Sequence, residues 1–209
     1  QCAQKNSERN WNSRGMFIAC SRTKAHGNTH PSSLPFDDSH LLKNIEKITH
    51  IESITVFTRR DEFRMVQNII DATVRYIGME QMGGSHAPIP TDASAHKINI
   101  SPDEIVKEIS GVSCSQGLCF MRISTSLHEH TFGEVFPAIQ LQAGEKRRKF
   151  TMAVPDTKKL FGFHGTLDLN ATGQAVSMLS VGLVMVPHGY LSWVKLQPLT
   201  LTAAPRPAK

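Results

Sequence analysis

Short runs of apolar and β-branched residues, separated by polar segments, recur along the middle of this chain. The runs that fit a strand lie at 51–58, 68–77, 97–100, 118–126 and 149–154. Their length and their Val, Ile, Thr and Phe content are typical of β-strands rather than of amphipathic helices. The region from Leu34 to Val186 therefore predicts an all-β fold, such as a sandwich, a barrel or a prism, with almost no helix.

Two local assignments depend on the polar residues beside these runs. The charged segment 59–62 is predicted to be a turn between two strands. The segment 105–109 fits a strand, but it also fits a short helix, because Ser101 or Asp103 can act as a helix N-cap. The sequence alone leaves these two alternatives open.

The longest patterned stretch, 159–186, predicts two buried strands joined by a polar loop. Apolar and β-branched residues fill both ends of this stretch, and Asp, Asn, Thr and Gly are concentrated between Thr166 and Gly173. These residue types form turns, because they bond to their own backbone or tolerate positive φ. We therefore expect the loop between these strands to form a binding edge.

Composition is consistent with one globular domain that carries a tail at each end. The chain has 209 residues, 40% of them hydrophobic and 20% charged, so it is long enough to bury a core without disulfides. No apolar run reaches the length of a membrane-spanning helix, which predicts a soluble protein with no membrane span. The net charge of +5 permits weak attraction to nucleic acid, but a dedicated nucleic-acid partner is not expected.

The two ends lack the strand pattern. Segment 1–34 has five Lys or Arg residues and one Glu, which fits an organelle transit peptide or, as we favour, an irregular tail. Segment 187–209 places Tyr190 and Trp193 in an apolar stretch before a Pro-rich end, and exposed aromatic residues often mark a protein contact. We expect three parts, 1–34, 35–186 and 187–209, with protein partners at the two ends. The compartment is left open.

Residues with reactive side chains do not form an enzyme motif. The chain has no G-x-S-x-G elbow, phosphate-binding loop or zinc-protease helix, so we predict no enzyme and no cofactor. Four cysteines without C-x-x-C pairs argue against a zinc ribbon. Cys114 and Cys119 can bridge a hairpin in an oxidising compartment, although Cys119 also fits a small buried residue.

A His-x-His sequence at His128 and His130 is the one pattern with metal-ligand spacing. On a strand, residues two apart lie on one face, so both imidazoles can approach one ion. A third ligand is not evident nearby in the sequence. An exposed turn is therefore the favoured interpretation.

A series of motifs follows in order from residue 35 to residue 186. The motifs are Pro35-Phe-Asp-Asp38, Ile51 to Phe57, Ile70 to Tyr76, Gly83-Gly84, Ile98 to Gly111, Phe150 to Val154 and Phe161-Gly-Phe-His-Gly165. In order and spacing this series resembles the jacalin-related lectins. The resemblance implies a β-prism of three four-stranded Greek-key sheets around a pseudo-threefold axis, without a cofactor.

The resemblance also implies a sugar site. Jacalin-related lectins bind sugar hydroxyls through a glycine near the N-terminus and a G-x-x-x-D loop before the last strand, and a carboxylate is a strong acceptor for such hydroxyls. The corresponding loop consists of Gly173, Gln174, Ala175, Val176 and Ser177. Ser177 replaces the aspartate of the motif, and Gln174 and Ala175 stand where aromatic residues are frequent.

Four further residues complete the predicted sugar site. Gly27 is the nearest counterpart of the N-terminal glycine, and Gly83 and Gly84 provide another loop. Asp168 lies in a loop that is longer than is usual in the family, and it can supply a carboxylate by another route. The resemblance implies that the chain binds a mannose-like or related glycan, free or on a glycoprotein. The alternative is a jacalin-fold module that binds no sugar and serves in a larger assembly, including a homo-oligomer.

Overall fold

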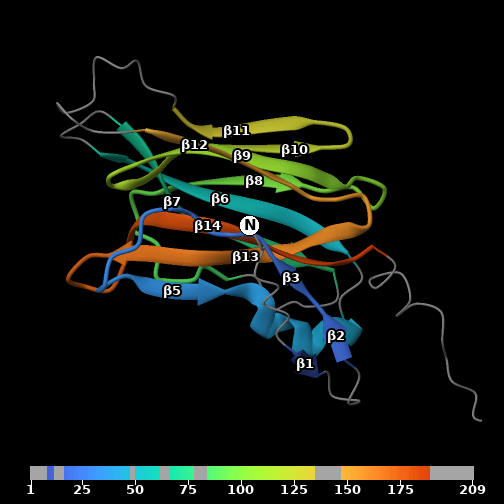
Figure 1. The fold of residues 1–209 in the computed structure, drawn as a ribbon. Helices are drawn as coiled ribbons and strands as arrows, with labels where there is room; N and C mark the ends of the chain where they lie inside the picture. Colours follow the sequence, from blue (N-terminus) through green and yellow to red (C-terminus); the bar gives the residue numbers. More distant parts are fainter. Residues whose placement is uncertain are drawn as a thin grey trace, which may run out of the picture.

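The computed structural model describes residues 9–11, 17–47, 50–61, 66–77, 84–134 and 147–188. Within them the fold is nearly all β, with three larger antiparallel sheets and a small two-stranded pair (Figure 1). The small pair consists of β1 (Arg9–Trp11) and β2 (Phe17–Ala19). The described part of the chain has no helix that is long and apolar enough to cross a membrane.

Two of the three larger sheets consist of strands that are consecutive in the chain, and the third combines strands from its first and last parts. One sheet has the order β11 (Glu129–Gly133), β10 (Gly117–Thr125), β9 (Val106–Cys114) and β12 (Arg148–Ala153). A second has the order β7 (Val66–Tyr76), β6 (Ile51–Asp61) and β8 (Ser94–Asn99). The third has the order β3 (Ser21–Arg22), β14 (Ala175–Pro187), β13 (Lys158–Leu169) and β5 (Leu34–Asp37), with β4 (His26–Gly27) beside β14.

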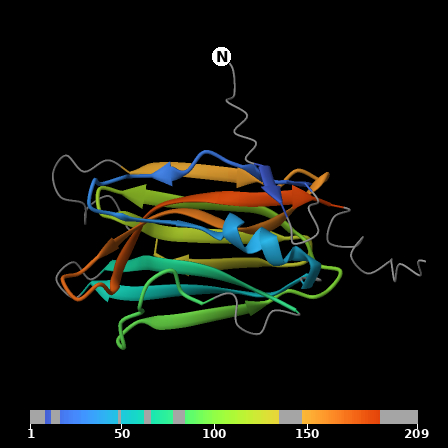
Figure 2. The same cartoon turned by 90° about the horizontal axis from the view of Figure 1, so that it is seen from below.

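One hydrophobic core lies between these sheets. It combines Ile54 and Val74 of the second sheet, Met121 and Ile123 of the first, and Phe161 of the third, all fully or almost fully buried. The 3-10 helix η1 (Asp38–Lys47) connects β5 to the second sheet and packs against β13 (Figure 2). The all-β prediction is confirmed, because apolar side chains from three sheets pack together in this core.

The structure decides the one open assignment and corrects two of the predicted ones. Residues 106–109 belong to β9, so the strand alternative is correct. The predicted turn at 59–62 is wrong, since β6 continues through Arg59 and Arg60 to Asp61, paired with β7. The loop predicted from Thr166 is also too long, because β13 stays paired with β14 as far as Leu169. In both places cross-strand hydrogen bonds outweigh the polar side chains that suggested a turn.

Two other differences concern the number and place of strands. Among the described residues the sheets hold four, three and five strands, where the resemblance implied four in each. The segment before residue 34 also contains short strands, because β3 and β4 pair with β14. The proposed boundary at residue 34 stays a prediction.

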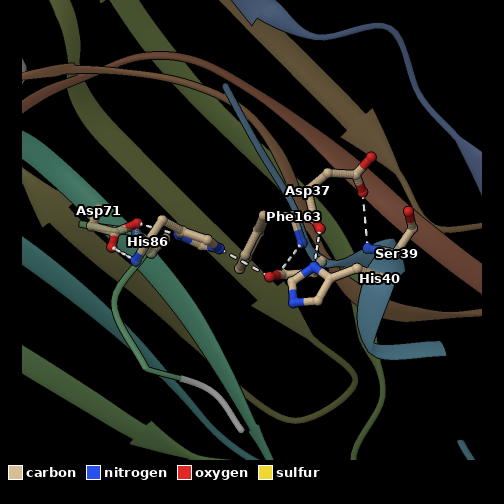
Figure 3. Close-up of polar contacts among 8 residues, drawn as sticks. Asp37, Ser39, His40, Asp71, His86 and Phe163 are labelled. Carbon is tan, nitrogen blue, oxygen red and sulfur yellow. Dashed lines mark hydrogen bonds and ion pairs between the residues drawn. The ribbon is translucent and has the colours of Figure 1, made fainter. Parts of the chain in front are cut away.

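A buried polar network ties four parts of the fold together (Figure 3). His86 lies between two carboxylates, with Nε2 2.9 Å from Asp38 and Nδ1 2.7 Å from Asp71. The backbone N–H of Phe163 donates to the other oxygen of Asp38 at 2.8 Å. Burial by itself would lower the pKa of His86, but hydrogen bonds and the charges of both aspartates outweigh it and raise this pKa to about 9. The network therefore contains an imidazolium between two carboxylates.

Candidate functional site

A groove of about 490 Å³ lies at one end of the prism. Four parts of the chain meet there: the segment after β4, the start of β7, the hairpin between β9 and β10, and the facing ends of β13 and β14. Its wall consists of Asn28, Thr29, His30, Ser32, Asn68, Ser115, Gln116, Asp168, Val176, Ser177 and Leu179. The structure thus brings together residues that are as much as 151 positions apart, from Asn28 to Leu179.

Asp168 supplies the carboxylate of this groove. It lies on β13 directly opposite Ser177 of β14 and is half-buried. Among the residues that the structure describes, its carboxylate has no hydrogen bond or ion pair. The aspartate that the sequence suggested as an alternative acceptor therefore lies in the groove wall, where Asp168 is available to accept hydrogen bonds from a ligand.

Ser177 has a different role from the aspartate of the motif. It is 3% exposed, and its hydroxyl donates to the backbone carbonyl of Gln116 at 2.6 Å. This bond holds the β9–β10 hairpin against β14. The hydroxyl is used within the protein, so Ser177 contributes to the shape of the groove more than to its free polar surface.

Substituting Asp for Ser177 is expected to destabilise the fold by at least about 2 kcal/mol. The carboxylate would be buried against the Gln116 carbonyl, and two acceptors repel each other. Urea unfolding should show the loss, while Ser177→Ala should cost only about 1 kcal/mol. Unchanged stability of Ser177→Asp with a gain of sugar affinity would contradict this account.

Gly27 lies beside the groove and positions its next residues. Its φ is +123°, a region that favours glycine, and it pairs with Ser180 on β14. The following residue, Asn28, donates its backbone N–H to the carbonyl of Leu179 at 2.9 Å and its side-chain amide to that of Cys114 at 2.6 Å. Gly27 therefore allows the segment from Asn28 onward to line the groove.

The predicted motif from Gly173 to Ser177 divides into two parts. Gly173 and Gln174 belong to a turn that is held by Asn170, whose side chain accepts the N–H of Gln174 at 2.9 Å. Ala175 is fully buried and donates its N–H to the carbonyl of Pro88. Within this motif only Val176 and Ser177 line the groove.

Gly84 is not among the described residues that form the groove wall. A Cβ added to Gly84 would meet no atom within 4 Å, so this residue is open to solvent on that side. Gly83 lies outside the described residues, as do Tyr190 and Trp193. The roles predicted for Gly83, Tyr190 and Trp193 therefore stay predictions.

Several groove residues were not identified from the sequence. Thr29, Ser32, Asn68, Ser115 and Gln116 belong to no motif and enter the groove only through tertiary contacts. The one usable signal was the polar turn Ser115-Gln116 between two apolar strands, because such turns lie at the ends of a sheet.

The two cysteines beside the groove are thiols in the structure. Cys119 is buried and donates to the carbonyl of Val112 at 3.4 Å. A hydrogen bond with the Cys114 thiol, together with burial, raises the pKa of Cys119. Cys119 thus behaves as the small buried residue that the apolar run around it suggested.

Comparisons with known proteins identify the family and the fold of this chain. The sequence model of the Jacalin-like lectin domain matches residues 25–173. No curated protein sequence matches the chain.

Solved structures of similar fold include three plant proteins. A mannose-specific jacalin-related lectin from Morus nigra is 14% identical, with a TM-score of 0.50 over 79% of this chain and 93% of that one. A mannose-binding jacalin-related lectin from Ananas comosus is 11% identical, with a TM-score of 0.52 over 81% and 99%. The agglutinin from Calystegia sepium is 15% identical, with a TM-score of 0.50 over 80% and 96%.

At such identities these structures establish the fold, and they confirm the predicted β-prism. The family match adds to this, because it covers most of the chain, including β5 to β13 and the residues of the groove from Asn28 to Asp168. The chain therefore belongs to the jacalin-like lectin domain family, whose members bind carbohydrates.

Proposed function

We propose that the groove binds one neutral sugar residue of a glycan through Asp168. The observation that carries this proposal is a half-buried carboxylate without a partner among the described residues, placed at the wall of a groove. A carboxylate can accept two sugar hydroxyls in charge-assisted hydrogen bonds, which are about twice as strong as neutral ones.

The other groove residues suit the same ligand. Thr29, Asn68 and Gln116 carry neutral donors and acceptors, and Val176 and Leu179 offer apolar surface to the C–H face of a sugar ring. The volume of about 490 Å³ lies within the usual range of roughly 300–1,000 Å³ for small-ligand sites. Asp168 would repel a carboxylate or sulfate on the ligand, so an uncharged sugar fits better than an acidic one.

Mannose is the first sugar to test. Two of the similar structures are described as mannose-specific and mannose-binding, which supports mannose or a related hexose here. The choice among neutral hexoses depends on how their hydroxyls fit the groove. Binding to a panel of neutral and acidic glycans determines which sugar is preferred.

Asp168→Asn is expected to weaken sugar binding by roughly 10- to 100-fold, the loss of a hydrogen bond to a charged group. Calorimetric titration with the glycan selected by the panel measures this. Asp156→Asn is the matched control. It makes the same change at an exposed aspartate of the β12–β13 turn, which forms an ion pair with Lys107 of β9. Equal affinity of Asp168→Asn and the wild type would reject Asp168 as the sugar acceptor.

A second function is favoured by Ser177. A buried serine replaces the aspartate of the family motif, and its hydroxyl is already bonded to the Gln116 carbonyl. This observation favours a groove that no longer binds sugar. The chain would then serve as a jacalin-fold interaction module or structural subunit. Failure of the folded wild type to bind any glycan on the panel would favour this alternative.

A further inference from the structure

A cluster of three ligand-type side chains lies on the edge of the first sheet, away from the groove. His130 belongs to the edge strand β11, and His128 immediately precedes that strand. Glu104, from the segment between β8 and β9, reaches the same place. One ligand atom from each of the three lies within 4.8 Å of the others. The third ligand that the His-x-His sequence lacked is therefore supplied by tertiary contact.

Glu104 is a preorganised carboxylate rather than an exposed surface acid. Its side chain is 2% exposed. One oxygen accepts the backbone N–H of Ser101 at 3.2 Å, and the other accepts the hydroxyl of Thr125 and contacts Nδ1 of His128 at 3.1 Å. These bonds orient the carboxylate toward the two imidazoles, as the hydrogen bonds around metal ligands commonly do.

The two imidazoles are placed to complete the cluster. Their ring centres are 6.0 Å apart and their planes are inclined by 49°. His128 is 63% exposed and can rotate, while β10 holds the backbone of His130 through its pairing with Ile123. A tetrahedral zinc site separates its ligand atoms by about 3.3 Å, so closing the present spacing requires only a side-chain adjustment.

We propose that Glu104, His128 and His130 bind one divalent transition-metal ion, with Zn²⁺ the best fit. Two imidazoles and one carboxylate suit zinc, whereas Ca²⁺ and Mg²⁺ prefer oxygen ligands. Three protein ligands leave a coordination position open to water or to a group of another molecule.

This metal site is independent of the sugar groove. The turn with Gln116 precedes β10, and the turn with Ser126 to His128 follows it, so the two sites lie at opposite ends of a nine-residue strand (Figure 1). At about 3.3 Å per residue, the ten steps from Gln116 to Ser126 correspond to a separation of about 33 Å. A variant at one site should leave the other unchanged.

Calorimetric titration of the full chain with ZnCl₂ tests the proposal. We expect one ion per chain, and a loss of affinity of at least about tenfold in Glu104→Gln and in His130→Ala. CaCl₂ should give no binding. His40→Ala is the matched control, because it removes an exposed histidine of η1 and should bind zinc as the wild type does.

Substitution with Co²⁺ gives a second readout that reports the ligands directly. The visible spectrum should indicate nitrogen and oxygen ligands without thiolate charge transfer, and Glu104→Gln should alter it. Circular dichroism shows whether each variant is folded. Absence of stoichiometric zinc binding in the wild type, zinc binding that persists undiminished in folded variants, or a thiolate spectrum would each overturn the proposal.

Discussion

Raising the pH from about 6 to about 8.5 is expected to lower the free energy of unfolding by about 2–3 kcal/mol through His86. The pKa of His86 is about 9 in the folded protein, above the ordinary value of 6.5. Its stabilisation is therefore complete below pH 6.5 and is lost as the pH rises toward 9. Urea unfolding at several pH values measures this loss.

Among the residues that the structure describes, few other groups change the stability in this pH window. Burial lowers the pKa of both His26 and His164. These two histidines therefore change the stability mainly at pH values below about 6.5. The raised pKa of Cys119 acts only above about pH 8.5, where an unfolded thiol ionises, which sets the upper limit of the measurement.

Removal of His86 provides the variant that tests the same network. His86→Ala leaves Asp38 and Asp71 buried without their cation, and it should cost about 3–5 kcal/mol at pH 6. The pH dependence between 6 and 8.5 should also disappear. His30→Ala, a change at an exposed histidine, should retain both stability and pH dependence. A flat profile in the wild type would show that His86 is not charged in the folded state.

Gly27→Ala is expected to abolish sugar binding and to cost about 2–4 kcal/mol of stability. A Cβ at this position would lie 2.1 Å from the carbonyl oxygen of Leu179, and the φ of +123° is unfavourable for alanine. The backbone must therefore move away from β14, which displaces Asn28 and the groove wall that follows it.

Glycan titration and urea unfolding of the same samples test both parts of this prediction. Gly84→Ala is the matched control, because an added methyl group there meets nothing within 4 Å. It should keep both affinity and stability. If Gly27→Ala were folded and bound sugar with wild-type affinity, the segment after β4 would not form part of the site.

Local sequence patterns were sufficient for the fold class and for the family. The short apolar and β-branched runs in the segments that form β6, β10 and β12 mark these segments as strands, and this information is local. The order of the motifs identified the family, because it too can be read from the sequence without knowing which strands become neighbours. Gly162 illustrates the link, since a side chain there would collide with Asp38 of the Phe-Asp-Asp motif. Local patterns failed at Arg59 and Leu169, where pairing with a neighbouring strand extends the strand beyond its apolar residues.

The two sites depended on tertiary structure. Residues 173–177 suggested a contiguous sugar loop, but the groove selects Val176 and Ser177 from it and adds Asn68, Gln116 and other residues from separate elements. His128 and His130 were visible as a pair, but their third ligand, Glu104, lies 24 positions earlier. The physical reason is common to both sites. A binding site is made where several strand ends meet, and only the packing of three sheets decides which ends become neighbours.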